Sequence, residues 1–118
     1  MLIVQNKGEA MGAGKTEDAI SELKRRLTNR FGPESETYLF GSVARGDSGP
    51  LSDIDILVLV PGEVNNSIEE EIFSLAYDVE LEFNVVFGIV VYSKKFWNSK
   101  VASYMPLYIN IKNEGVAL

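Results

Sequence analysis

Two aspartates, Asp53 and Asp55, are the residues whose types and spacing most directly suggest chemistry. They lie two positions apart in residues 52–60, a β-branched and apolar segment that predicts a strand. Side chains two apart on a strand project from the same face, so the carboxylates are expected side by side. Carboxylates held that close repel each other unless a cation lies between them or one is protonated. The pair is therefore a candidate site for Mg²⁺ or Mn²⁺.

A second group of candidates, Gly41, Ser42 and Arg45, precedes the aspartates. Gly41 and Ser42 follow a predicted strand at residues 37–40 and are expected to open a helical turn. Glycine there lets a ligand approach the backbone, and free amide groups together with the Ser42 hydroxyl can hold phosphate oxygens. Arg45, one turn further on, can neutralise a phosphate. A phosphate pocket facing a cation site suits metal-assisted phosphoryl or nucleotidyl transfer.

Each feature has an ordinary structural explanation when taken singly. A Gly-Ser pair is more often a plain turn, and an Asp-x-Asp is more often a solvated surface feature. The functional interpretation is favoured by their order and spacing together. A strand is followed by Gly-Ser, then by a loop, and then by an Asp-x-Asp that lies on a second strand. Since the chain contains no Cys and no His, it excludes disulfides, thiolate or histidine metal sites and a histidine general base. Acid–base or metal chemistry must then use carboxylates, Lys or Tyr.

Length and charge limit the remaining classes. The 118 residues suit one domain, and the longest apolar run, residues 85–92, is strand-sized, so no membrane segment is expected. The absence of Cys fits a cytoplasmic protein. Residues 47–82 carry ten acids and no base, within a net charge of −6. Direct nucleic-acid binding, which needs a basic stripe, is therefore disfavoured.

Residues 1–15 are rich in glycine and small residues and are interpreted as a loosely ordered leader before a single domain at 16–118. Residues 12–16, Gly-Ala-Gly-Lys-Thr, suggest a P-loop, but that motif requires a glycine at the position of Glu9. A flexible turn is the preferred interpretation.

Hydrophobic periodicity predicts an α/β (α+β) fold, a small mixed β-sheet flanked by helices. Thr16 is expected to cap the first helix, and Ser93 the helix whose Phe96, Trp97 and Val101 face inward. The predicted elements are a helix at 16–31, strands at 37–40 and 52–60, a helix at 66–83, a strand at 85–92, a helix at 93–105 and a short helix within 107–118.

Residues 40–46 and 52–58 resemble the signature of the DNA polymerase β-like nucleotidyltransferase superfamily, in particular its small prokaryotic minimal nucleotidyltransferases. The pattern of that family is Gly-Ser, ten residues, Asp-x-Asp, and the same spacing is present here. Residues 89–97 and 110–116 resemble the later strand and the terminal segment of those proteins. The resemblance covers residues 17–118.

The resemblance implies a polymerase β-like nucleotidyltransferase core that binds ATP or another nucleoside triphosphate through Mg²⁺ (or Mn²⁺). A nucleoside monophosphate would pass to an acceptor. By the same resemblance, Gly41 and Ser42 would contact the triphosphate, while Asp53 and Asp55 would hold metal as catalytic residues. The acceptor is expected to be a partner protein, such as a HEPN-type helical toxin that an antitoxin of this kind silences by adenylylation.

One departure from the family pattern supports an alternative. Active members usually add a third carboxylate from a neighbouring strand, but residues 85–92 contain no acid, and Gly88 or Phe87 takes that place. Glu80 or Glu82, with Glu82 the nearer candidate, could substitute if the helix before this strand ends early, but a position on the surface at the end of that helix is the preferred interpretation of both. The alternative is a nucleotidyltransferase fold that has lost chemistry and masks its partner. An aminoglycoside-modifying enzyme shares the motif, but such an enzyme is expected to be longer.

Overall fold

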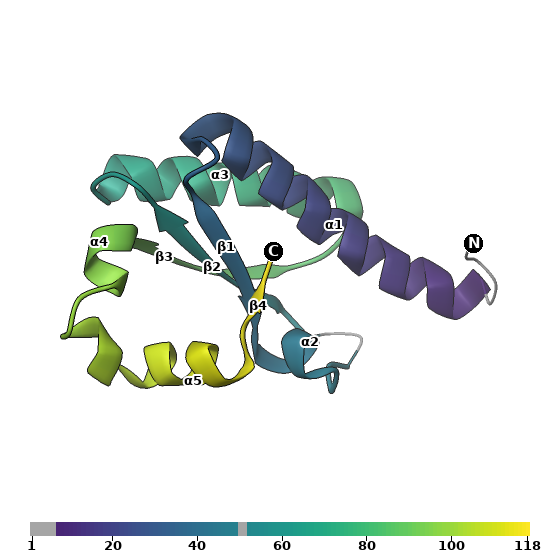
Figure 1. The fold of residues 1–118 in the computed structure, drawn as a ribbon. Coiled ribbons are helices and arrows are strands. Elements are labelled where there is room, and N and C mark those ends of the chain that lie inside the picture. Colours follow the sequence, from purple (N-terminus) through teal and green to yellow (C-terminus); the bar gives the residue numbers. More distant parts are fainter. Residues whose placement is uncertain (1–6, 50–51) are drawn as a thin grey trace.

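The computed structural model describes residues 7–49 and 52–118. Its strands are β1 (Glu36–Phe40), β2 (Ile54–Val60), β3 (Phe87–Ser93) and β4 (Val116–Ala117). They form one sheet in the order β3-β2-β1-β4 (Figure 1). β1 pairs antiparallel with both β2 and β4, whereas β2 and β3 are parallel. The sheet is mixed, which confirms the predicted fold class.

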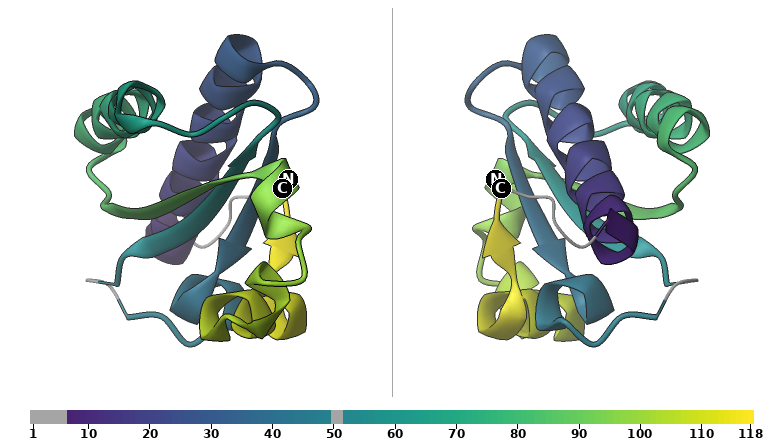
Figure 2. Two further views of the ribbon diagram at one scale, coloured as in Figure 1. Left: turned by 90° about the vertical axis from the view of Figure 1, so that its left-hand side faces the viewer. Right: turned by 90° about the vertical axis from the view of Figure 1, so that its right-hand side faces the viewer.

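Helices cover both faces of this sheet. Helices α1 (Lys7–Phe31) and α3 (Asn66–Phe83) lie on one face, as Figure 2 shows. Helices α4 (Lys94–Trp97) and α5 (Pro106–Glu114), joined through the 3₁₀ turn η1 (Ala102–Tyr104), lie on the other. The short helix α2 (Gly41–Arg45) follows β1 directly. In the described part of the chain, no helix combines the length and the apolar character needed to cross a membrane.

The central strand β2 is buried on both sides, as its continuous apolar run predicts. Ile56 and Val58 belong to the core beneath α1 and α3, and Leu57 and Leu59 to the core beneath α4 and α5. Because side chains alternate along a strand, Asp55 projects toward the same face as Leu57. The buried strand β2 therefore holds the side chain of Asp55, a predicted site residue, in a fixed direction.

The first helix begins earlier than predicted. Helix α1 starts at Lys7 instead of Thr16, so Thr16 lies inside the helix and the N-cap prediction is wrong. The expected flexible turn at residues 12–16 is also helical, while residues 1–6 of the expected leader lie outside the described residues. Leu23 and Leu27 are buried as predicted. Helix propagation adds one hydrogen bond per residue, which extends a helix through weak formers.

The later helices also differ from the expectation. Ser93 caps α4 by accepting a hydrogen bond from the Phe96 N–H, as predicted, but α4 ends at Trp97. The Ser99 hydroxyl donates to the Phe96 carbonyl (2.6 Å) and accepts from the Ala102 N–H (3.3 Å), and such local bonds compete with helix. Val101 is consequently 68% exposed, and its predicted inward direction is wrong.

The chain end forms a strand that hydrophobic periodicity did not predict. β4 is two residues long, too short for an alternating pattern, and pairs Val116 with Leu39. The Leu118 N–H donates to the Thr37 carbonyl (3.0 Å), and the Lys24 ammonium donates to the Leu118 carbonyl (2.6 Å). These contacts fix the end of the chain on the sheet, beyond α5.

Candidate functional site

Gly41 joins β1 to α2 and lies against Asp55. The register of the sheet places Phe40 opposite Asp55, so the chain turns into α2 beside that carboxylate. Gly41 has a φ of +76°, and a Cβ atom built on it would lie 2.2 Å from Asp55 Oδ2. Glycine tolerates this φ without strain and leaves room for the carboxylate. The predicted turn and the predicted metal ligand are thus in direct contact.

Gly88 borders the same carboxylate from the other side. Parallel pairing of β2 with β3 places Gly88 beside Asp55. A Cβ atom on Gly88 would lie 2.7 Å from Asp55 Oδ1. Asp55 is therefore held between two glycines, on α2 and on β3. The sequence shows Gly88 only as a residue that stands in place of an acid, because its spacing role depends on the pairing of β2 with β3.

Asp53 lies one residue before β2 and is exposed, whereas Asp55 is half-buried. Burial raises the pKa of Asp55 above its usual value, and the nearby Asp53 carboxylate raises this pKa further. The Arg45 guanidinium partly offsets both effects. The negative charges of these two neighbouring carboxylates repel each other. A divalent cation bound to both would stabilise their charged forms.

A protein-only metal cage is not present in the part of the chain that the structure describes. No three carboxylates or other ligands are grouped there closely enough to hold a metal ion. Mg²⁺ is commonly held by one or two carboxylates together with substrate phosphates. Asp53 and Asp55 suit that arrangement.

Ser42 occupies the first turn of α2 and is half-buried. No side chain caps the start of this helix, so its first N–H groups keep their hydrogen-bonding capacity. The predicted helical turn after the strand is confirmed, and it begins beside Asp55. Binding of phosphate by Gly41 and Ser42 stays a prediction.

Arg45 ends α2 and is held by two acids. Its guanidinium Nε lies 3.2 Å from Asp47 Oδ2, and its Nη1 lies 3.0 Å from Glu114 Oε2 on α5. Both bonds raise the pKa of Arg45. These two carboxylates were not predictable from the sequence, which indicates only that Arg45 could neutralise a phosphate. A phosphate would have to compete with them.

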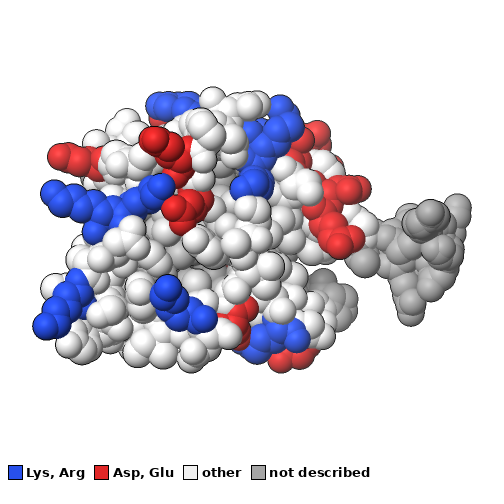
Figure 3. All heavy atoms as spheres, viewed as in Figure 1, with Lys and Arg blue, Asp and Glu red and all other residues white. Residues whose placement is uncertain are grey.

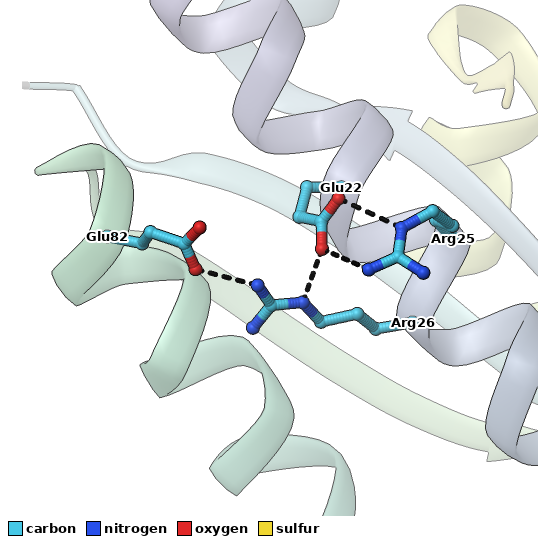
Figure 4. Close-up of polar contacts among 4 residues, drawn as sticks. All are labelled: Glu22, Arg25, Arg26 and Glu82. Atoms are coloured by element: carbon cyan, nitrogen blue, oxygen red, sulfur yellow. Dashed lines mark hydrogen bonds and ion pairs between the residues drawn. The ribbon is translucent and has the colours of Figure 1, made fainter.

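Glu82, the suggested substitute for a third catalytic carboxylate, is directed elsewhere. Its Oε2 accepts a hydrogen bond from Arg26 Nη2 on α1 at 2.6 Å (Figure 4). Arg26 also donates to Glu22, as does Arg25, and these bonds lower the pKa of Glu22 to about 2. Helix α3 continues through Phe83, so Glu82 stays on a helix that contacts α1. The preferred interpretation of Glu82 as a surface residue at the helix end is confirmed, and the condition for its alternative role, an early end of the helix, is not met.

Glu80 has a structural role near the site. Its Oε2 accepts a hydrogen bond from the Phe87 N–H at 2.7 Å, at the start of β3. Phe87 pairs with Ile54, the residue between the two aspartates. Glu80 therefore anchors the strand beside the site.

We expect Glu82→Gln to leave nucleotide binding and transfer unchanged. The substitution weakens an ion pair whose glutamate is 56% exposed, and such pairs contribute about 0–1 kcal/mol to stability. Thermal unfolding measures the stability of the variant, an ATP titration measures nucleotide binding, and labelled ATP with a partner protein measures transfer. A large loss of nucleotide binding would contradict the assignment of Glu82 to the contact between α1 and α3.

Charged side chains are mixed on the face of the molecule that Figure 3 shows. Lysines and arginines form separate groups there among aspartates and glutamates, without a continuous basic stripe on that face. That direct binding of nucleic acid is disfavoured stays a prediction from the composition.

Comparison with known proteins identifies a nucleotidyltransferase domain in this chain. A family model described as a nucleotidyltransferase domain matches residues 20–117. The protein MJ0604 of Methanocaldococcus jannaschii is 33% identical over 103 residues, which are 86% of this chain and 96% of that protein. MJ0141 of the same organism is 34% identical over 78 residues, 65% of this chain and 79% of that protein. Both names describe candidate protein adenylyltransferases.

Two solved structures share the fold. A toxin–antitoxin structure, MntA–HpeT, aligns with a TM-score of 0.56 and 24% identity over 86% of this chain and 70% of that chain. A candidate nucleotidyltransferase from Sulfolobus solfataricus aligns with a TM-score of 0.54 and 22% identity over 97% of this chain and 90% of that chain. At these identities the likeness concerns the fold alone.

Proposed function

The chain belongs to the nucleotidyltransferase domain family, and from that membership we infer that it transfers a nucleoside monophosphate from ATP, or another nucleoside triphosphate, to a partner protein. The observation that carries this inference is the contact between Gly41 and the Asp55 carboxylate. This contact supports the proposal, because the backbone that would bind phosphate lies next to one of the two carboxylates that would bind the cation.

The residues of the site have separate tasks in this proposal. Gly41 and Ser42 bind the triphosphate, and Asp53 and Asp55 would hold Mg²⁺ or Mn²⁺. The bound cation supplies charge neutralisation for the triphosphate. Arg45 is available to a phosphate oxygen if the ion pairs with Asp47 and Glu114 open.

The proposed transfer is a displacement reaction at the α-phosphorus of the nucleoside triphosphate. The acceptor hydroxyl oxygen forms a bond to that phosphorus, the bond to the leaving pyrophosphate breaks, and the hydroxyl proton passes to solvent or to a carboxylate. Such chemistry depends chiefly on positioning and electrostatic stabilisation. A rigid strand holding Asp55 meets the first requirement.

The relatives support a protein as the acceptor. MJ0604 and MJ0141 are named as candidate protein adenylyltransferases, and a toxin–antitoxin structure with AMP-PNP aligns with this chain at a TM-score of 0.54. We therefore propose ATP as the donor and a separate helical protein, such as a HEPN-type toxin, as the acceptor. The chain would then act as the antitoxin.

A second candidate function rests on Gly88. The residue beside Asp55 on β3 is a glycine, where active members of the superfamily usually carry an acid. A protein with two carboxylates could still bind a metal–nucleotide complex and silence its partner by masking it. The two candidates predict the same nucleotide binding but different products.

Labelled ATP separates the two functions. We expect the isolated chain with Mg²⁺ and α-labelled ATP to show no detectable turnover, since the acceptor is missing. Addition of a helical protein encoded by a neighbouring gene should give slow labelling of that protein. Rapid labelling of small molecules without any partner would contradict a protein acceptor. ATP binding without label on such a partner would favour masking.

A further inference from the structure

Three exposed apolar side chains form a row along the outer face of α3. Phe73, Tyr77 and Leu81 are 45%, 57% and 65% exposed and lie four residues apart. Residues at this spacing are neighbours on one side of a helix. In Figure 2 the outer side of α3 faces away from the sheet, and none of the other described elements covers it. A continuous apolar row of this kind usually marks an interaction surface.

The row leads toward the candidate site. Val86, which follows the turn after α3, is 55% exposed. Its carbonyl accepts a hydrogen bond from the Ile54 N–H at 2.8 Å, and Ile54 lies between Asp53 and Asp55. A molecule that covers the row from Phe73 to Val86 would therefore end beside the two carboxylates.

The charged side chains of α3 itself are all acidic. Helix α3 contains six acids and no basic residue. Two of them, Glu71 and Glu82, are ion-paired with Arg30 and Arg26 of α1. Glu70 and Asp78 are exposed and lie three residues before Phe73 and Leu81, respectively. These two carboxylates border the row and form no ion pair with the described cations, so a partner at this surface should be basic.

We propose that the outer face of α3, Phe73, Tyr77 and Leu81 with Glu70 and Asp78, docks an amphipathic helix of the acceptor protein that carries Lys or Arg beside its apolar residues. Apolar contact would supply affinity, and opposite charges would select the partner and speed its association. The proposal rests on the proposed function for its purpose, because the row ends at the site where the acceptor must arrive.

A synthetic peptide tests the surface without an identified partner. The probe is a labelled helix of about five turns, roughly 18 residues, made of Leu and Lys with all leucines on one side. A peptide of equal composition with scattered leucines is the control probe. Binding to the full chain is measured by fluorescence anisotropy at low and high salt. We expect the amphipathic peptide to bind more tightly than the scattered one, and more weakly in high salt.

Two tyrosine variants locate the binding. Tyr77→Lys places a cation in the middle of the row and should weaken peptide binding at least about tenfold, through lost apolar contact and charge repulsion. Tyr104→Lys is the matched control, since Tyr104 is 71% exposed on η1, on the other face of the sheet, and should leave binding unchanged. Neither variant should change ATP binding or thermal unfolding.

Several outcomes would overturn the docking surface. These are equal binding of both peptides, equal weakening by both variants, or no peptide binding at all. Sedimentation that shows a dimer disrupted by Tyr77→Lys would assign the row to a second copy instead. An ATP titration of the same samples keeps the two proposals distinguishable. ATP binding without peptide binding refutes only the docking surface, and peptide binding without ATP binding refutes only the proposed function.

Discussion

Replacement of both Asp53 and Asp55 by asparagine should abolish nucleotide-dependent binding of Mg²⁺ and reduce transfer by more than about a thousandfold. Asparagine keeps the size of the side chain but removes both negative charges. Because the structure offers no third ligand among its described residues, the site has no substitute for this pair. Calorimetric titration of the variant with Mg²⁺ and ATP measures the binding, and labelled ATP measures the transfer.

The control for this pair removes the same charge elsewhere. Glu17 and Asp18 on α1 are both exposed and lie outside the proposed docking surface, so Glu17→Gln with Asp18→Asn changes the net charge equally. We expect this control to bind metal and nucleotide like the parent. The folded state of the site variant should also persist, since it loses a half-buried carboxylate whose charge is disfavoured by burial and by the Asp53 carboxylate. Unchanged metal binding in the site variant would refute the assignment of the two aspartates.

The pKa of Asp55 gives the same site a pH dependence. Burial and the Asp53 carboxylate raise this pKa above 3.8, so Asp55 takes up a proton at a higher pH than an ordinary aspartate does. Protons compete with the cation for the carboxylate. The affinity for Mg²⁺ should therefore fall as the pH is lowered toward the raised pKa, and begin to fall sooner than it would for an unperturbed aspartate.

Much of the fold was predictable because periodic segments are long. Helix α3 runs from Asn66 to Phe83, the same bounds that its apolar spacing predicts, and β2 matches its apolar run closely. Elements without such a pattern were not predictable. The strand β4 has two residues, and α4 ends where Ser99 bonds to the backbone, which is a local competition that periodicity does not register.

The candidate site was predictable where one motif holds its residues together in sequence. The spacing from Gly41 and Ser42 to Asp53 and Asp55 led to a family resemblance that the nucleotidyltransferase domain match confirms. Contacts made through strand pairing were not visible in that spacing. Gly88 lies beside Asp55 only because β2 and β3 pair in one register.

The pairing of Glu82 was beyond sequence reasoning for the same reason. It depends on the packing of α3 against α1, which brings Arg26 to within 2.6 Å of its carboxylate. Periodicity indicates which side of a helix is apolar, but it does not tell which charged residues of two packed helices meet. The sequence therefore favours a surface position for Glu82, but it does not identify Arg26 as its partner.

The other large effect is expected from Gly41→Ala. The added Cβ would lie 2.2 Å from Asp55 Oδ2, 3.1 Å from Asp55 Cγ and 3.2 Å from Asp55 Cβ, so the carboxylate must move. We expect ATP binding in the presence of Mg²⁺ to weaken at least about tenfold, because a shift of a ligand by a fraction of an ångström disturbs a site that depends on positioning. Gly41→Val, which also blocks the approach of phosphate, should be more damaging still.

Gly46→Ala is the matched control for backbone strain. Gly46 has a φ of +81°, close to the +76° of Gly41, but a Cβ atom there would meet nothing within 4 Å. Both alanine variants should therefore lose about 1–2 kcal/mol of stability from the left-handed backbone, and Gly41→Ala should lose more because its Cβ also displaces Asp55. Only Gly41→Ala should also lose nucleotide binding. Thermal unfolding and ATP titration of the two variants separate strain from the contact with Asp55.

Ser42→Ala completes the comparison at the same turn. It removes one hydroxyl that can donate to a charged phosphate, a bond of roughly 1–3 kcal/mol, while the backbone and Asp55 stay in place. The expected order of damage to ATP binding is Gly41→Val, then Gly41→Ala, then Ser42→Ala, with Gly46→Ala unchanged. If the Gly41 variants bound ATP as tightly as Gly46→Ala does, the turn would be ordinary structure. The two aspartates would then have to hold the nucleotide without the backbone of α2.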